Sequence, residues 1–353
     1  MKQLVEERGA TAQGVESVLR EQIIAGAFAP GAQLPTRVEL IERFGTTNVT
    51  IQRALDRLRD GEWVEATRRG TFVSPSPPHL ARYGLVFRQP LHDVMHPLSR
   101  LYGALHQEAI RLENEREGEL RFAVFAGVDN HSDNPQLRRL IEQVHAQRFA
   151  GLIFADGIYE LAATPLIGAD LPCVVLSGEE FRGVARLQLD WDSWLEKSLD
   201  YLQSRGKNRL AVISHRNEGD PFNAQIAEKA RARGLEIPPF WMQCTTVEFA
   251  RAARPLAHLL MQSQPRPDAL LVTDDNLVES ASAGLLAAGV SIPEELEVVA
   301  HCNLPWLTPS VVPFTRIGFD VRQMLALALD ALQSAQRGEN RAPRIRLEAT
   351  FAA

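Results

Sequence analysis

Hydrophobic residues follow two different patterns along the chain, and the change falls near residue 80. Before it, apolar residues recur every three or four positions in short stretches, which predicts helices at about 14–25, 36–44 and 47–58. Two short β-prone stretches, 63–65 and 71–73, follow, and a turn with two arginines joins them. The first part of the chain is therefore expected to be a small helical domain that ends in a hairpin.

The helix expected at 47–58 has two unlike faces. Its apolar face holds Ile51, Ala54, Leu55 and Leu58, and its other side carries the polar residues Asn48, Thr50, Gln52, Arg53 and Arg57. A helix that enters a DNA groove needs this division, because one face packs on the domain while the other offers hydrogen-bond donors. A solvated surface helix would look the same, but the hairpin tipped with Arg68, Arg69 and Gly70 favours DNA binding.

The local signals at the helix ends agree with this pattern. Thr36 and Glu39 have the spacing of a capping box, in which each side chain accepts a hydrogen bond from a free backbone amide. Gly26 and Gly45 follow the first two helices as stop signals. Trp63 is expected to belong to the hairpin core and not to a DNA contact.

After residue 82, apolar strand-like runs alternate with helical stretches. We expect strands at 83–87, 121–126, 151–155, 173–176, 184–189, 209–214, 269–273 and 297–300, with helices at 98–113, 135–147, 191–204, 223–233 and 277–288. Such alternation with short connections predicts parallel sheets covered by helices on both faces. About ten strands exceed the needs of one compact sheet, so we predict an α/β fold with two lobes.

A proline-rich stretch separates the two patterns. Three of the five residues 74–78 are proline, which continues neither a sheet nor a helix. We therefore predict a DNA-binding domain at 1–74, a semi-rigid linker at 75–81 and a sensor domain at 82–353.

Charge and cysteine content support this division. Residues 1–74 hold ten basic and ten acidic residues, so the remaining 28 basic and 34 acidic residues account for the whole net charge of −6. A neutral small domain can still bind DNA if its positive charges share one face.

The three cysteines are widely spaced, and no apolar run reaches the roughly 20 residues of a membrane helix or forms a signal peptide. The sequence is thus expected to be that of a cytoplasmic protein with free thiols and no membrane contact.

The first domain resembles the GntR-type winged helix-turn-helix family. The shared positions are Pro30-Gly31, Leu34-Pro35, Phe44-Gly45, Ala54-Leu55 and the segment 70–73. The resemblance implies contacts to double-stranded operator DNA from the starts of two helices and from the wing, here Thr36, Arg37, Thr47, Asn48, Val49, Thr50, Gln52, Arg53, Arg68, Arg69 and Gly70. The chain departs from the family pattern at 36–38 and at Asn48, so the operator preference does not transfer.

The second domain resembles the sensor domain of LacI/GalR-type regulators. The resemblance rests on several short motifs in order, among them 204–213, Leu271 to Asp275, Gly289 to Pro293 and Pro313 to Ile317. A GntR-type head on such a sensor is the arrangement of arabinose-type repressors. It implies a homodimeric repressor that binds a small-molecule effector, a sugar or sugar derivative, between its two lobes.

Ligands of open parallel sheets bind beyond the carboxyl ends of the strands. This rule and the resemblance select the effector-binding candidates Arg88, Gln89, Asp129, Asp156, Asp190, His215, Arg216, Phe222, Asp274, Cys302, Asn303 and Trp306. Structural roles stay open for several of them: Asp156 fits a turn, Asp190 fits a helix cap and Trp306 fits a loop core. Asp274 also fits a helix cap, but the resemblance favours a ligand role for it.

Two departures bear on the effector. Cys302 stands where relatives usually carry a sugar-binding aspartate, and Phe222 and Asn223 fall where they often carry an arginine. The effector is then an uncommon sugar, a more apolar molecule, or absent altogether.

His92, Asp93 and His96 have a possible metal spacing, but Pro97 and the loop context favour a cleft rim or a dimer contact, and we expect no metal.

An enzyme with a DNA-binding head is the alternative class. However, the sequence has no Walker loop, no Gly-x-Gly-x-x-Gly turn after a strand and no nucleophile elbow. Its second domain also lacks the length and the lysine context of an aminotransferase-like fusion. The sequence therefore predicts a regulator without a cofactor.

Overall fold

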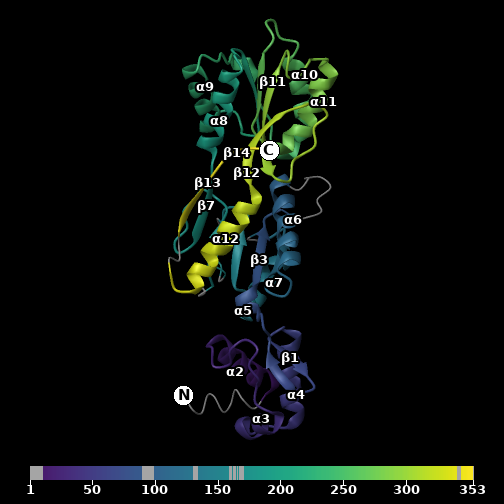
Figure 1. Cartoon of the computed structure of the whole chain (residues 1–353), viewed down its shortest axis with the longest axis vertical. Helices are drawn as coiled ribbons and strands as arrows, with labels where there is room; N and C mark the ends of the chain where they lie inside the picture. Colours follow the sequence, from purple (N-terminus) through teal and green to yellow (C-terminus); the bar gives the residue numbers. More distant parts are fainter. Residues whose placement is uncertain are drawn as a thin grey trace.

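The computed structural model describes residues 11–89, 99–129, 134–158, 161, 164, 166, 171–339 and 343–352. Figure 1 shows three bodies along the longest axis: a small head that contains α2 to β1, a first lobe built around β3, and a second lobe built around β11. The predicted fold class, a small helical head with a two-lobed α/β domain of parallel sheets, is confirmed.

The head consists of three helices and a two-stranded antiparallel wing. Its elements are α2 (Ala12–Ile24), α3 (Arg37–Phe44), α4 (Asn48–Asp60), β1 (Val64–Thr67) and β2 (Gly70–Val73). The capping box of Thr36 and Glu39 is present, and Gly45 ends α3 in the left-handed conformation, as predicted. Trp63 is 2% exposed within the core of the head, which also confirms its predicted structural role.

The predicted linker is partly helical. Helix α5 (Pro78–Ala81) occupies its second half, and the side chains of Pro78 and Ala81 are buried. The prolines continue no helix, but Pro78 begins one, because the first helical position needs no amide hydrogen and suits the fixed φ of proline.

The first lobe is a parallel sheet with strand order β4-β3-β5-β6-β7-β13. The strands are β3 (Arg82–Phe87), β4 (Arg121–Ala126), β5 (Gly151–Phe154), β6 (Cys173–Val175), β7 (Ala185–Asp190) and β13 (Arg344–Glu348). Helices α6 (Arg100–Glu115) and α12 (Val321–Gln336) share one hydrophobic core with one face of the sheet. Helix α7 (Pro135–His145) packs in a second core on the other side.

The second lobe has strand order β9-β8-β10-β11-β12-β14, and only the pairing of β12 with β14 is antiparallel. Its strands are β8 (Leu210–Ser214), β9 (Met242–Cys244), β10 (Ala269–Val272), β11 (Glu297–Leu304), β12 (Thr315–Asp320) and β14 (Thr350–Phe351). Helices α8 (Trp191–Ser204) and α9 (Pro221–Ala232) pack on one face. The other face packs against α10 (Ala253–Leu260) and α11 (Val278–Ala288).

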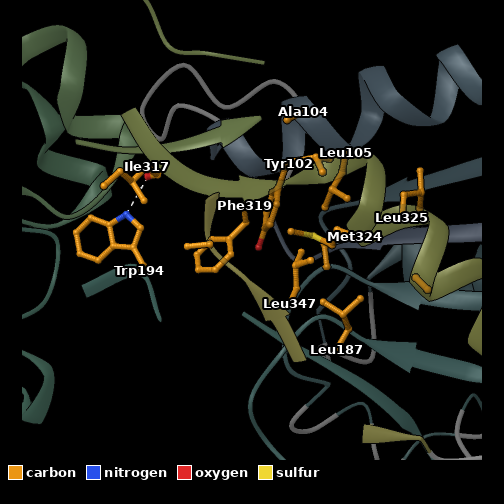
Figure 2. Packing of buried hydrophobic residues seen from close by; sticks show 14 of the residues in the cluster. Tyr102, Ala104, Leu105, Leu187, Trp194, Ile317, Phe319, Met324, Leu325 and Leu347 are labelled. Atoms are coloured by element: carbon orange, nitrogen blue, oxygen red, sulfur yellow. Dashed lines mark hydrogen bonds between the residues drawn. The ribbon is translucent and has the colours of Figure 1, made fainter. Parts of the chain in front are cut away.

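The chain passes between the lobes three times, from β7 to α8, from β12 to α12 and from β13 to β14. One hydrophobic core continues through these crossings. Figure 2 shows Phe319, Met324 and Leu347 in this region, and the indole nitrogen of Trp194 donates to the carbonyl oxygen of Ile317 at 2.8 Å. The lobes are therefore joined by packed crossing segments and not by a single tether.

The sequence pattern missed several of these elements. No element was predicted for α10, α12, β9, β12, β13 or β14, and β11 continues to Leu304 instead of ending near Ala300. Twelve strands in two sheets replace the predicted ten or so in the described part of the chain. None of the helices described is long and apolar enough to cross a membrane.

Candidate DNA-binding surface and effector cleft

Helix α4 presents the predicted polar surface. Its apolar residues Ile51, Ala54, Leu55 and Leu58 are buried in the head, whereas Asn48, Val49 and Arg53 are exposed. Thr47 caps the helix through a hydrogen bond from the amide of Thr50. Gln52 is less accessible, because it is half-buried and donates to Asp56 one turn further on.

The wing and the start of α3 extend this surface. Thr36, Arg37, Arg68 and Arg69 are exposed, and within the described ranges no ion pair occupies these arginines. Gln33 donates from its side-chain amide to the carbonyl oxygen of Arg69 at 3.1 Å and so holds the wing tip. At Gly70 φ is +135°, and a Cβ atom would lie 2.7 Å from that amide nitrogen, so glycine is needed here.

The candidates of the first lobe gather at one edge of its sheet. Arg88 and Gln89 follow β3, Asp129 follows β4 and Asp156 follows β5, and these three strands are neighbours. Burial raises the pKa of the Asp156 carboxyl, and the nearby Arg88 opposes this shift. The side-chain oxygen of Gln89 is buried and has no hydrogen-bond partner in the described structure. This edge therefore offers polar groups that a ligand can satisfy.

The candidates of the second lobe also lie at strand ends. The Nδ1 atom of His215 is 2.9 Å from the hydroxyl of Thr273 and 4.0 Å from a carboxylate oxygen of Asp274. Burial lowers the pKa of His215, which favours the neutral ring. Asp274 accepts hydrogen bonds from the backbone and side chain of Asn276, so it caps the short helix η4 (Asp275–Leu277). The predicted cap is present, and a ligand role for Asp274 remains a prediction.

An aromatic group that the sequence pattern did not single out adjoins these residues. The ring of Trp191, at the start of α8, lies 6.1 Å from that of His215, 6.0 Å from Phe222 and 4.9 Å from His301. Arg216 lies over Phe222 at 5.9 Å. Trp191 directly follows Asp190 at the first lobe crossing. That position was the sequence signal that could have identified Trp191 as a neighbour of the candidates.

Two of the candidates are fixed inside β11. The side chain of Cys302 is fully buried, and burial raises the pKa of its thiol to about 12. Asn303 is also buried and donates to the Asp275 carboxylate at 2.6 Å. The expectation that both follow the strand was wrong, because the pairing of β11 with β12 extends to Leu304. As placed, the Cys302 side chain has no surface with which to contact an effector.

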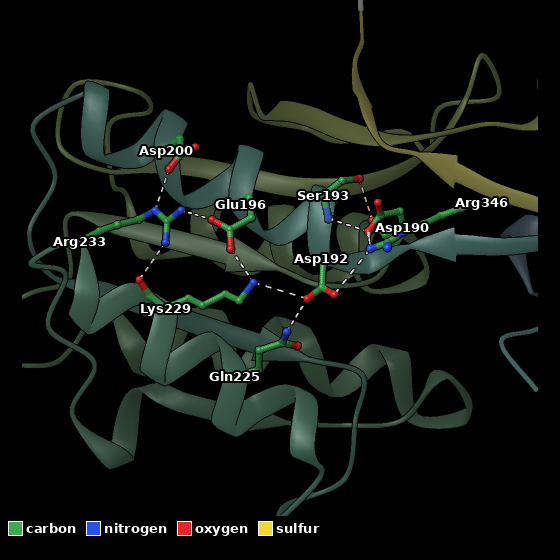
Figure 3. Close-up of polar contacts among 9 residues, drawn as sticks. All are labelled: Asp190, Asp192, Ser193, Glu196, Asp200, Gln225, Lys229, Arg233 and Arg346. Atoms are coloured by element: carbon green, nitrogen blue, oxygen red, sulfur yellow. Dashed lines mark hydrogen bonds and ion pairs between the residues drawn. The ribbon is translucent and has the colours of Figure 1, made fainter.

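Asp190 serves as a helix cap and as an ion-pair partner at the lobe crossing. Its carboxylate accepts from the amide of Ser193 at 2.9 Å and from Arg346 of β13 at 2.6 Å (Figure 3). These bonds with Arg346 and Ser193 hold the pKa of Asp190 below its usual range even though burial acts in the opposite direction. The capping alternative is present, and Asp190 also joins two of the three crossings.

A large cavity lies between the lobes at a different place. It has a volume of about 880 Å³ and lies between the first turns of α6 and the segment that includes α10, α11 and the loop at 306–308. Of the twelve effector candidates, only Trp306 lines it. The indole nitrogen of Trp306 is buried without a hydrogen-bond partner in the described structure. The sequence did not predict this cavity, because its lining comes from α6, η3 (Val247–Ala252), α10, α11 and the loop at 306–308, which are far apart in the chain and meet only through tertiary packing.

The described residues include no group of histidine, cysteine and acidic side chains that could hold a metal ion. His92, Asp93 and His96, the possible metal set of the sequence, lie outside the described residues.

This geometry defines a class of protein in which a DNA-binding head precedes a two-lobed ligand-binding domain. Family comparison agrees with it. Residues 11–73 match the model of the gntR family of bacterial regulatory proteins, and residues 199–351 match that of a periplasmic binding protein-like domain. The chain thus carries a GntR-type winged helix-turn-helix joined to a periplasmic-binding-protein-like domain. No curated protein is similar enough to the chain to count as a match.

Solved structures of LacI-family transcriptional regulators share the fold of the second domain. A regulator from Lactobacillus casei with bound glucose is 18% identical, with a TM-score of 0.56, and covers 77% of this chain and 98% of its own. The same regulator with bound sucrose gives 19% identity, a TM-score of 0.57 and the same coverage. A regulator from Bifidobacterium animalis subsp. lactis is 17% identical, with a TM-score of 0.57, and covers 77% and 96% of the two chains. At these identities, the likeness shows the fold.

Proposed function

We propose that this transcriptional regulator is a repressor of a carbohydrate-utilisation operon and that a sugar or sugar derivative bound between its lobes controls its operator binding. The observation that carries the proposal is an exposed polar surface on α3, α4 and the wing of a small head, next to a two-lobed domain whose lobes are joined by packed crossings. The glucose and sucrose bound to the L. casei regulator support the choice of effector class. Such a repressor works in the cytoplasm, where its operator lies.

The effector site that we propose lies at the carboxyl ends of the strands. The first lobe contributes Arg88, Gln89, Asp129 and Asp156, and the second contributes His215, Arg216, Phe222, Asp274 and Trp306. Hydroxyl groups of a sugar suit the carboxylates and amides of this set, and its apolar C–H face suits the rings of Trp191 and Phe222. A ligand that contacts both lobes favours their closed arrangement, since it shifts the equilibrium by its difference in affinity for the two states.

The working unit that we propose is a homodimer. Ile110 of α6, Leu259 of α10 and Leu286 of α11 are 45–59% exposed, and Figure 1 places these helices on the same side of the molecule. Exposed apolar side chains on one side suit contact with a second copy. Two heads related by a two-fold axis would read a near-palindromic operator, and lobe closure would change their separation.

Operator binding tests the proposal directly. Fluorescence anisotropy with DNA from upstream of the protein's own gene is expected to give salt-dependent binding with a dissociation constant of about 10 nM. Replacing Arg53 or Arg68 with alanine removes an exposed cation from α4 or the wing, so each variant should bind this DNA about tenfold more weakly.

The sensor provides the control for these variants. Arg53→Ala and Arg68→Ala lie in the head, so both should keep the wild-type thermal shift with any sugar that binds. The proposal fails if the full-length protein binds no DNA from this region at low salt. It also fails in its assignment of the reading surface if both variants bind as tightly as the wild type.

A further inference from the structure

The surface of the head that we assign to DNA carries two exposed apolar side chains. Val38, the second residue of α3, is 65% exposed, and Val49, the second residue of α4, is 58% exposed. The other large apolar side chains among residues 11–74 are buried or half-buried. Because valine also has a lower helix propensity than alanine, the stability of the head explains neither exposed valine. Both valines suit a contact with a partner molecule.

The side chains around the valines favour an anionic partner. Arg37 precedes Val38, and Arg53 follows Val49 by one turn of α4. Both arginines are exposed, and within the described ranges neither forms an ion pair. Figure 1 shows α3 at the end of the head farthest from the lobes, with α4 beside it. A DNA duplex can therefore reach this surface, where the arginines can contact phosphates while the valines face the bases.

The first turn of α4 has one hydrogen-bonding side chain to spare. Asn48 is exposed, and its amide group has no partner in the described structure. Thr50 is half-buried, and its hydroxyl oxygen lies 3.0 Å from that of Thr47. Gln52, in the next turn, is half-buried and donates from its side-chain nitrogen to Asp56 at 3.0 Å. The first turn contains no lysine or arginine, so its chemistry towards DNA comes from an amide and a valine.

We propose that the first turn of α4 selects A·T base pairs, with Asn48 hydrogen-bonded to an adenine and Val49 against a thymine methyl group. In the major groove, an asparagine amide matches the N6 and N7 atoms of adenine, whereas arginine and lysine match guanine. The C5 methyl group of thymine is the apolar group of that groove. Val38 makes a second methyl contact from the start of α3. This inference rests on the proposed operator binding and adds which bases the head selects.

The test begins with a selection of duplexes from a random pool by the full-length protein. We expect the selected half-sites to share A·T base pairs. Two base analogues are then placed in the selected duplex, one position at a time. Deoxyuridine removes only the methyl group of a thymine, and 7-deazaadenine removes only the N7 acceptor of an adenine. Fluorescence anisotropy with each duplex measures what the deleted group contributes to binding.

The wild type should be sensitive to both analogues. We expect deoxyuridine to weaken binding about fourfold at a thymine that a valine covers, since the contact removes a methyl group from water. The analogue 7-deazaadenine should weaken binding about tenfold at the adenine that Asn48 contacts. Val49→Ala and Val38→Ala should each lose the sensitivity to deoxyuridine at one thymine. Asn48→Ala should lose the sensitivity to 7-deazaadenine, because the partner of the deleted acceptor is then missing.

Arg68→Ala is the matched control, because Arg68 lies between the wing strands and not on α3 or α4. It should weaken binding to the unmodified and the modified duplexes by the same factor, so its sensitivity to both analogues equals that of the wild type. Thermal melting verifies that all the variants are folded, as expected for exposed positions.

Three results overturn the inference while leaving operator binding intact. In the first, either analogue leaves the wild-type affinity unchanged at every position. In the second, Val49→Ala keeps the sensitivity to deoxyuridine at every thymine, or Asn48→Ala keeps the sensitivity to 7-deazaadenine. In the third, size-exclusion chromatography shows that Val49→Ala changes the oligomeric state while its sensitivity to deoxyuridine is that of the wild type, which would make the valine a protein contact. A full-length protein that selects no DNA at low salt would instead overturn the proposed operator binding, and this inference with it.

Discussion

His301 is a fully buried histidine whose two ring nitrogens have no hydrogen-bond partner in the described structure. It is packed among aromatic rings, with Trp191 at 4.9 Å and Phe319 at 5.7 Å between ring centroids. Burial lowers the pKa of His301 to about 4, while Asp274 acts in the opposite direction and His215 lowers it further. The folded protein therefore keeps this ring neutral at pH values where the unfolded chain protonates it.

This residue makes the stability of the protein depend on pH. Between the ordinary histidine pKa of about 6.5 and the folded value of about 4, the unfolded state binds a proton that the folded state does not, so stability falls as the pH falls. Replacing His301 with phenylalanine removes this dependence and the two unsatisfied nitrogens. At pH 5 the variant should gain about 2 kcal/mol over the wild type, relative to their difference at pH 7.5.

Urea unfolding at pH 5 and pH 7.5 measures the effect. Asp275 is a second buried group, since burial and the charge of Asp274 raise its pKa to about 7, but it is common to both proteins and cancels in their difference. A stability difference that stays the same at both pH values would contradict the assigned burial of a neutral histidine.

At the scale of elements, the head is attached to the first lobe by more than the chain connection. Glu62, just after α4, pairs with Arg121 of β4 at 2.8 Å, and Arg148 donates to the carbonyl oxygen of Asp60 at 3.1 Å. The ring of Trp63 stacks on that of His79 in α5 at 5.2 Å. Glu62 has a φ of +63°, which costs a non-glycine residue about 1 kcal/mol. The residue that forms the ion pair with Arg121 therefore has a strained backbone.

These contacts predict a protected linker. Arg121→Gln removes the charge that holds Glu62 and a donor to the carbonyl oxygen of Ser76, so the head should separate more often and loosen the backbone of α5, where thermolysin can cleave at the exposed Leu80. We expect the cleavage rate to rise about threefold, and the further change Glu62→Gln to add little, because both substitutions break the same contact.

Arg59→Gln is the matched control for this experiment, because Arg59 pairs with Asp56 inside α4. Its cleavage rate should equal that of the wild type. Equal rates for Arg121→Gln and the wild type would show that the ion pair does not hold the head.

Local signals predicted the elements whose boundaries depend on nearby residues. The capping box of Thr36, the stop at Gly45 and the apolar face of α4 were legible because each involves positions three or four apart. The sequence also carries a helical signal for α12, in the spacing of Val321, Met324, Leu325 and Ala328, although no element was predicted there. The short strands β13 and β14 carry no such signal, because their pairing partners lie 158 residues and 32 to 34 residues away.

At the scale of the whole molecule, three crossings join the two lobes on either side of the effector site that we propose. The ion pair of Asp190 with Arg346 and the core around Phe319 join the crossings to one another (Figures 2 and 3). A change in lobe angle therefore moves the first lobe, which holds the head, relative to the second.

The strand-end rule predicted where most of the effector-binding candidates lie in the fold, and their role in binding stays a prediction. It placed Gln89, His215 and Asp274 correctly at strand ends, because alternating strands and helices specify where the loops converge. It failed for Cys302, whose strand continues through a long-range pairing with β12. The rule could not find the cavity of about 880 Å³ between the lobes, because Arg100 and Arg254 come together there only through the packing of α6 near α10.

Effector control of the head is tested most directly by measuring operator affinity in the presence and absence of a sensor ligand. A thermal-shift screen of sugars and polyols first identifies the compound that raises the melting temperature most, and anisotropy then gives the dissociation constant for DNA with and without it. We expect this compound to change operator affinity at least about tenfold, which is a coupling of about 1.4 kcal/mol between the two sites. A screen in which nothing binds, or a bound compound that leaves operator affinity unchanged, would contradict effector control of the head.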